Sequence, residues 1–209
     1  MINLHWSNGV LTTEGLSALG AHEIGIAEPR IDWRNDAQEL LSAIANYVMS
    51  SGRVILAEET MNYGFWLIKF RTSPNAALAV HEYNENGTEF VPGAKLAMEF
   101  WRDQHYVCKS VNAEFAPPRP DELVAISQDL PQVHDVEGVR YELGPSRSGW
   151  IITSRGFDGP VQSLRQEHLL HLVDWRRDLI RYLALPVGFR FASNGESHVW
   201  FDQKVAATR

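Results

Sequence analysis

The sequence predicts an α+β fold, with mixed antiparallel sheets and packed helices arranged as two small lobes. Segments typical of strands and of helices are mixed along the chain, without the regular alternation that a parallel βαβ sheet requires. A stretch with three prolines, residues 116–121, interrupts the pattern, because proline removes a backbone donor and restricts φ. The 209 residues suffice for one large domain or two small ones, and this interruption favours two.

The first predicted element is a helix over 37–50. Asn35 or Asp36 can cap its start, and Ser51-Gly52 ends it. Its apolar residues recur at helical spacing and mark one buried face. They are Leu40, Leu41, Ile44, Tyr47 and Val48.

Strand signals dominate the rest of the first half. Residues 77–83 and 88–91 flank the turn sequence 84–87 and are predicted to pair as a hairpin. An aromatic-rich strand is expected over 63–71. Alternating apolar residues favour a strand over 96–101, and a short helix over 102–111 follows.

The second half contains further predicted strands, a hairpin and two helices. The strands are 123–127 and 149–153, the hairpin is formed by 189–192 and 198–201, and the helices are 164–173 and 176–183.

Charge is distributed unevenly along the chain. The net charge is −7; 8 basic and 14 acidic residues lie up to Pro118, against 11 and 12 after it. We therefore divide the chain into an acidic N-terminal α+β lobe over 1–118, a proline-containing linker over 119–132 and a C-terminal α+β domain over 133–209. An acidic surface repels nucleic acid and anionic membranes and attracts a basic partner, although such a charge is also common in proteins that simply stay soluble.

Cysteine usage and the N-terminus indicate a cytoplasmic protein. Cys108 is the single cysteine, which excludes an intramolecular disulfide and fits a reducing compartment. The first six residues contain no basic cluster and no apolar segment of a signal peptide. No apolar run approaches the roughly 20 residues that span a bilayer, so no membrane association is expected.

Catalytic and cofactor motifs are missing from the sequence. It contains no glycine-rich phosphate loop and no Gly-x-Ser-x-Gly elbow. His168 and His171, three residues apart in an expected helix, would share one face and could bind a metal, but no nearby residue completes a ligand set. We therefore predict no catalytic residue, no metal and no cofactor. A small metal-dependent hydrolase that uses both histidines is the alternative.

The order of parts from Ser148 to Asp202 resembles a known family. A Gly149-Trp150 strand, a histidine-bearing segment with His168 and His171, the run Leu185-Pro186-Val187-Gly188 and the strand Phe189-Arg190-Phe191 follow one another. This order is similar to that in immunity family thirty-three of bacterial polymorphic toxin systems. Arg176-Arg177 stands where the family has Arg-Pro, which leaves the start of the second helix open. Short sequence segments of the first part also resemble longer members of the group. Among these segments are 59–66, 101–104 and 114–120.

The resemblance implies an immunity protein that binds and neutralises a cognate toxin or secreted effector acting in the cytoplasm, by occluding its active site. It carries over no catalytic or contact residues. From the acidic and aromatic residues of the first part we predict a toxin-binding set. It consists of Glu58, Glu59, Tyr63, Trp66, Glu82 and Glu85. A protein-binding adaptor with no toxin remains a further alternative, and the oligomeric state is left open.

Overall fold

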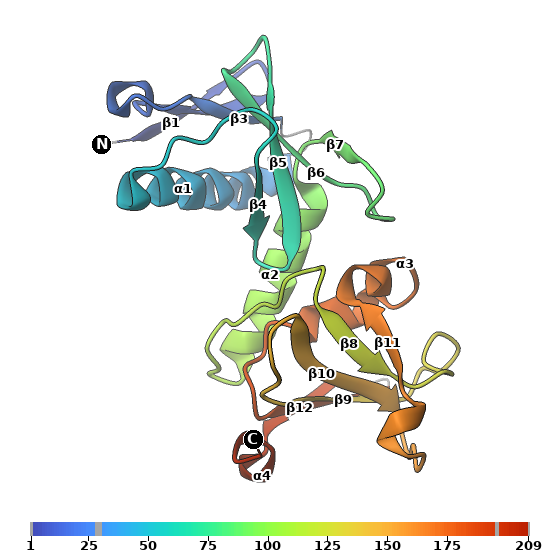
Figure 1. Cartoon of the computed structure of the whole chain (residues 1–209). Helices are drawn as coiled ribbons and strands as arrows, with labels where there is room; N and C mark the ends of the chain where they lie inside the picture. The colour runs from blue at the N-terminus through green and yellow to red at the C-terminus, as the bar shows by residue number, and fades with distance from the viewer. Residues whose placement is uncertain (1, 28–30, 195–196, 209) are drawn as a thin grey trace. The chain divides into compact units, whose positions relative to one another are not determined.

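The computed structural model describes residues 2–27, 31–194 and 197–208 and has an α+β fold with one sheet in each of two compact units (Figure 1). The units are Met1–Arg102 and Asp103–Arg209, so the division falls within helix α2 (Lys95–Ser110). This division lies before the segment 119–132 in which the sequence analysis places a linker. Strand β8 (Leu123–Ile126), within that segment, belongs to the second sheet.

The first unit is built on a seven-stranded sheet ordered β1-β2-β3-β6-β5-β4, with β7 also paired to β6. Neighbouring strands are antiparallel, except that β3 and β6 are parallel. The strands are β1 (Asn3–Ser7), β2 (Val10–Glu14), β3 (Ile24–Ala27), β4 (Thr60–Tyr63), β5 (Trp66–Thr72), β6 (Leu78–Tyr83) and β7 (Phe90–Pro92). The helices are η1 (Ser17–Leu19), η2 (Ile31–Trp33), α1 (Arg34–Ser51) and the beginning of α2.

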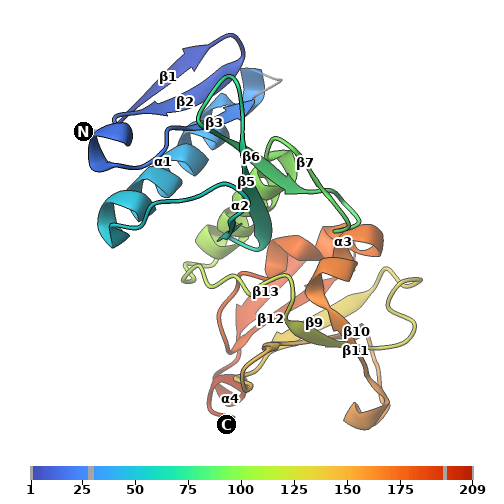
Figure 2. The same ribbon diagram turned by 45° about the horizontal axis from the view of Figure 1, so that its top comes forward.

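Helix α1 lies against β2 and β3 on one face of this sheet (Figure 2). The prediction of a helix over 37–50 is confirmed, and four of its five predicted apolar residues are buried. The exception is Tyr47, which is 36% exposed. The helix ends where the Gly52 N–H bonds the Val48 carbonyl with the glycine at φ +66°, a left-handed conformation that glycine adopts without strain.

The predicted hairpin of 77–83 and 88–91 is confirmed as β6 and β7, paired from His81↔Pro92 to Tyr83↔Phe90. The strand expected over 63–71 is instead the second half of a tight hairpin. Tyr63 ends β4, Gly64 turns the chain at φ +58°, and Trp66 begins β5 opposite Tyr63.

The strand predicted over 96–101 is wrong, because this segment forms the first turns of α2. The alternating residues Leu96, Met98 and Phe100 are all buried, but so is Ala97 between them. Six residues of alternation are too few to separate the two periods. The deciding group comes from far away in the sequence: the Glu82 carboxylate accepts hydrogen bonds from the Leu96 N–H (3.0 Å) and the Ala97 N–H (2.8 Å) at the helix start.

The second unit contains a six-stranded sheet ordered β11-β8-β10-β9-β12-β13, in which only β8 and β10 run parallel among the described strands. The strands besides β8 are β9 (Val136–Arg140), β10 (Arg147–Ser154), β11 (Arg165–His168), β12 (Phe189–Ser193) and β13 (Ser197–Phe201). The helices are η3 (Val161–Ser163), η4 (Leu169–His171), α3 (Leu172–Trp175), η5 (Arg177–Tyr182), α4 (Gln203–Ala206) and the end of α2. The predicted strands 123–127 and 149–153 and the hairpin of β12 and β13 are confirmed. The turn residues Gly195 and Glu196 lie outside the described residues.

The helix predicted over 164–173 is wrong in its first half. Residues 165–168 form β11, which pairs with β8 from Arg165↔Ile126 to His168↔Leu123. This edge of β8 offers backbone partners that no local pattern reveals. The helix predicted over 176–183 is the 3-10 helix η5, which begins after Arg176 with non-helical φ −142° and ψ 48°.

Candidate functional site

Three of the six residues predicted to bind a toxin line one groove in the first unit. The groove has a volume of about 750 Å³ and lies between α1, the segment that follows it, and β4. Glu58, Glu59 and Tyr63 line it. The other lining residues are Ala43, Ile44, Tyr47, Arg53, Val54, Ile55, Thr60, Met61, Asn62, Gly64, Phe70 and Trp101.

The groove has an apolar floor and a partly polar rim. Ile44, Ile55 and Phe70 are buried beneath it, whereas Tyr47 and Val54 are 36% and 39% exposed at its sides. Exposed apolar side chains around a concave surface are typical of sites that bind a partner or ligand. Tyr47 and Val54 are not among the residues predicted for the site from the sequence. The apolar run 54–56, placed in a segment without regular structure, was the available signal.

Tyr63 and Trp101 form one aromatic wall. Their ring centroids are 4.3 Å apart at an interplanar angle of 16°, and Trp101 Nε1 donates to Glu39 Oε1 at 3.1 Å. Burial raises the pKa of the Tyr63 hydroxyl far above its usual range, and the nearby carboxylates Glu39 and Asp36 raise it further. This wall is therefore neutral at any physiological pH and lies in a field of negative charge.

Glu58 and Glu59 lie at the start of β4. Glu58 has φ +70° in a bulge, where its N–H bonds the Phe70 carbonyl at 2.7 Å. Its carboxylate accepts from Lys69 Nζ at 2.7 Å and lies 3.8 Å from Arg71 Nε, and the hydrogen bond from Lys69 lowers its pKa. Glu59 Oε2 accepts from the Leu56 N–H at 2.9 Å. Glu58 is thus ionised, and its charge is partly neutralised by these two neighbours.

Trp66 and Glu82 do not contribute to the surface, because the structure buries both. Trp66 is 0% exposed, packs against Phe65 and Phe100, and donates Nε1 to the Tyr83 carbonyl at 3.1 Å. Glu82 is 4% exposed, and its carboxylate accepts a hydrogen bond from the backbone at the start of α2. Alternation along β5 and β6 places these residues on the helix-covered face, a placement that composition alone could not indicate. Glu85 lies in the exposed turn after β6 and does not line the groove.

Burial of Glu82 makes the stability of the chain sensitive to pH. Desolvation raises the Glu82 pKa from 4.5 to about 7, against the lowering effect of its hydrogen bonds with the backbone of Leu96 and Ala97. Because the folded state binds the Glu82 proton more tightly than the unfolded state does, protonation of Glu82 stabilises the fold. This contribution is complete below pH 4.5 and is lost as the pH rises through about 7. Relative to Glu82→Gln, which does not titrate, the wild type is expected to lose roughly 2–3 kcal/mol of unfolding free energy between pH 4.5 and 7.5. Urea unfolding of both proteins across this range is the measurement, and a constant difference between them would contradict it.

The two histidines lie in the second unit, at the end of β11 and in η4. Their ring centroids are 5.6 Å apart, and His171 Nδ1 is 3.0 Å from Glu167 Oε2. The other carboxylate oxygen of Glu167, Oε1, is 3.0 Å from Arg165 Nε. Among the described residues, no three His, Cys, Asp or Glu side chains are placed to hold a metal ion. The single cysteine, Cys108, is buried, and this burial raises its pKa to about 11. A thiol with such a pKa is a poor nucleophile at neutral pH.

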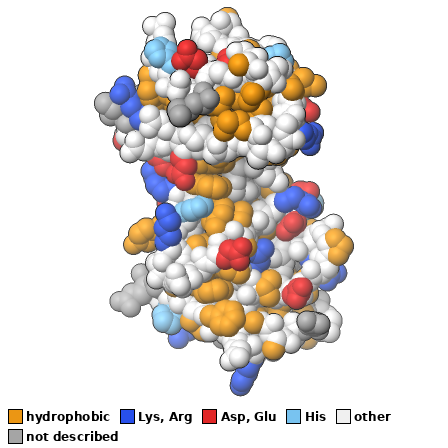
Figure 3. Space-filling model, turned by 90° about the vertical axis from the view of Figure 1, so that its left-hand side faces the viewer, with side chains coloured by type: hydrophobic (Ala, Val, Ile, Leu, Met, Phe, Trp, Pro, Cys, Tyr) orange, Lys and Arg blue, Asp and Glu red, His pale blue; other side chains and the backbone are white. Residues whose placement is uncertain are grey.

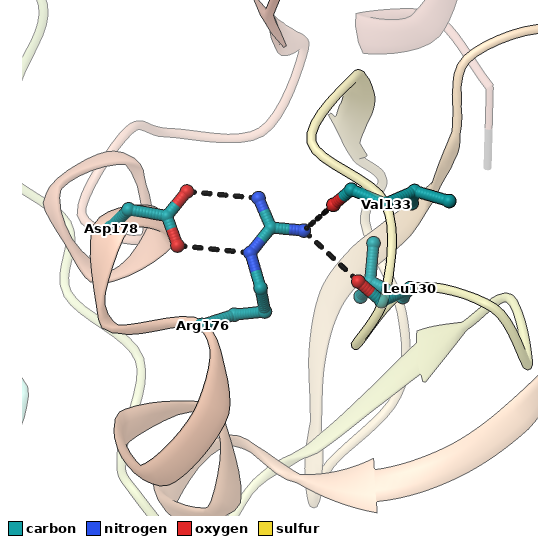
Figure 4. Close-up of polar contacts among 4 residues, drawn as sticks. All are labelled: Leu130, Val133, Arg176 and Asp178. Carbon is teal, nitrogen blue, oxygen red and sulfur yellow. Dashed lines mark hydrogen bonds and ion pairs between the residues drawn. The ribbon is translucent and has the colours of Figure 1, made fainter.

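Two arginines, the buried Arg176 and the half-buried Arg140, organise the second unit. Figure 4 shows the Arg176 guanidinium between the Asp178 carboxylate, at 2.8 and 2.9 Å, and the carbonyl oxygens of Leu130 and Val133, at 3.1 and 3.0 Å. Arg140 in β9 donates to backbone carbonyls of three other segments. Arg140 therefore ties these three segments to β9, and Arg176 ties the loop of Leu130 and Val133 to the start of η5. Both side chains have a structural explanation.

Comparison with protein families finds a match in this unit. The family model of the Imm33-like domain matches residues 103–202. This part of the chain is similar to the Imm33-like domain. The match begins at the first residue of the second compact unit, so the groove of the first unit lies outside the Imm33-like domain. No curated protein and no solved structure is significantly similar to the chain.

Surface and helix properties add two observations. On the face drawn in Figure 3, exposed hydrophobic side chains lie among acidic, basic and histidine side chains in both units. None of the helices in the described part of the chain combines the length and the apolar character needed to cross a membrane.

Proposed function

We propose that this protein is an immunity protein that binds a cognate bacterial toxin acting in the cytoplasm and neutralises it by occluding its active site. The observation that carries the proposal is the Imm33-like domain over 103–202. Occlusion requires a complementary surface with buried anchors and favourable charge, and it requires no chemistry by the inhibitor.

The charge of the chain supports a basic protein partner. The first unit has seven basic and twelve acidic residues, so it attracts a basic surface and repels nucleic acid. A toxin that binds phosphates or nucleic acid needs such a basic surface. The acidic first unit would then steer the toxin toward the inhibitor and accelerate association.

Within the first unit we place the toxin contact at the groove. Glu59 and Tyr63 remain in the proposed contact set with Glu58, since all three line the groove. Trp66 and Glu82 are withdrawn from it because they are buried, and Glu85 is withdrawn because it lies outside the groove.

Survival of cells tests the function. Cells that express the toxin encoded immediately upstream are expected to grow when this protein is also expressed, and a pull-down is expected to recover both proteins together. If cells are not rescued and no complex is recovered, the proposed immunity function is contradicted.

Charge reversal tests the position of the contact. Glu59→Lys is expected to weaken toxin binding at least about tenfold, because it places a cation where a basic partner docks. Glu85→Lys makes the same change outside the groove and is the matched control, expected to bind almost as the wild type. Equal or greater loss in Glu85→Lys would move the contact away from the groove.

A further inference from the structure

Strand β4 is an edge strand with backbone groups free to bond another chain. The sheet order ends at β4, which pairs with β5 alone among the described strands. The Phe70 N–H bonds the Glu59 carbonyl at 3.0 Å, so Glu59 and Phe70 are a hydrogen-bonded pair. Directly opposed residues of an antiparallel ladder alternate between bonded and non-bonded pairs. Met61 and Tyr63 therefore bond β5, and the N–H and C=O groups of Thr60 and Asn62 point away from it.

The outward groups of β4 border the groove. Thr60 and Asn62 are exposed, and both belong to the groove lining together with Met61 and Tyr63 of the same strand. On the opposite side of the groove lie Ile44 and Tyr47 of α1. A strand edge beside a helix, with an apolar groove between them, is the geometry that receives an extended peptide as an added strand. Alternate side chains of such a peptide would enter the groove.

The charges around the groove select its occupant. Glu58 and Glu59 lie at one end of β4, and Asp36 and Glu39 act on the Tyr63 hydroxyl at the other. Arg53 is the basic residue of the lining. A segment flanked by lysine or arginine complements these carboxylates, whereas a second copy of this acidic unit would bring like charges together.

We propose that the toxin docks by adding an extended segment to the free edge of β4, with apolar side chains at alternate positions in the groove and basic residues at its ends. The inference rests on the proposed function, since the segment belongs to the toxin. Four backbone groups, two on Thr60 and two on Asn62, form the new ladder. The contact thereby lies in the unit that the Imm33-like domain does not cover.

A proline substitution tests the ladder directly. Asn62→Pro removes the outward N–H and places the ring where the added strand would lie, and proline is tolerated on edge strands whose N–H faces solvent. Asn62→Ala alters the side chain alone and is the matched control. With the purified full chain and the toxin encoded immediately upstream, Asn62→Pro is expected to weaken binding at least about a hundredfold, and Asn62→Ala by less than about threefold. Thermal unfolding of both variants shows that they are folded.

Hydrogen exchange of the wild type needs no variant. The amides of Thr60 and Asn62 are expected to exchange rapidly in the free protein and to be protected at least about tenfold in the complex. Those of Met61 and Tyr63 bond β5 and are expected to be protected in both states, which provides an internal control.

The outcomes separate this inference from the proposed function. A complex that Asn62→Pro leaves intact, with Thr60 and Asn62 still exchanging rapidly, would overturn the added strand and leave the immunity function standing. Absence of any complex would overturn both. Protection of the two amides in a concentration-dependent dimer without toxin would assign the edge to a second copy and overturn the proposal.

Discussion

Replacing Arg140 by methionine is expected to lower the free energy of unfolding of the Imm33-like domain by about 3 kcal/mol. Arg140 donates Nη1 to the carbonyls of Ala116 (2.6 Å) and Leu185 (2.7 Å) and Nε to that of Ser148 (3.0 Å). Burial lowers the pKa of its guanidinium to about 10. Methionine fills much of the same space but leaves these carbonyls without their donor, and each buried unsatisfied group costs about 1–3 kcal/mol.

Chemical denaturation of the full chain measures this effect. Arg155→Met is the control, because the Arg155 side chain is 55% exposed and lies 3.9 Å from Glu137; an exposed ion pair of this kind contributes less than about 1 kcal/mol. Equal losses in the two variants would show that the Arg140 hydrogen bonds do not hold the segments together.

Gly149→Ala is expected to destabilise the same domain by at least about 3 kcal/mol. Gly149 has φ +81°, and a Cβ atom there would lie 2.1 Å from the Tyr141 carbonyl oxygen. That carbonyl cannot withdraw easily, because the Tyr141 N–H bonds the Gly149 carbonyl at 2.9 Å and ties the two residues together. Backbone strain and a steric clash therefore act at one position.

Two other glycines separate these contributions. Gly156 has φ +77° with no atom within 4 Å of a built Cβ, so Gly156→Ala measures the strain alone, expected at about 1–2 kcal/mol. Gly144 has open space and no positive φ, so Gly144→Ala is expected to be neutral or slightly stabilising. Denaturant unfolding compares the loss of unfolding free energy in the two variants. If Gly149→Ala loses no more than Gly156→Ala, the close approach of β9 and β10 at Gly149 is contradicted.

Local patterns predicted the elements whose stabilising contacts are local. Helix α1 has its periodic face within its own residues and its terminal glycine directly after them. The β6–β7 and β12–β13 hairpins have turn sequences between their strands. Helix α2 and strand β11 depend on partners outside the local window. Glu82 caps α2 from fourteen or fifteen residues away, and β8 pairs with β11 across about forty residues.

Local sequence patterns predicted the candidate site only in part, for the same reason. Glu58, Glu59 and Tyr63 were predicted because acidic and aromatic residues cluster in the sequence, and the structure places them in one groove. The same rule wrongly suggested surface roles for Trp66 and Glu82, which strand alternation turns to the covered face. Trp101 joins the site only because α2 brings its ring onto Tyr63, and that placement depends on a helix the local pattern did not predict.

The most direct test of the account is a calorimetric titration of the full chain into the toxin encoded immediately upstream. Inhibition by binding alone gives a single transition at one equivalent. Denaturant then recovers the toxin from the complex with unchanged mass, and refolding restores its toxicity. Heat that ends at one equivalent with an intact toxin is the signature of an inhibitor that acts by binding. Loss of toxicity at far below one equivalent, with a changed mass, would contradict the account and show that the protein acts on its partner as an enzyme.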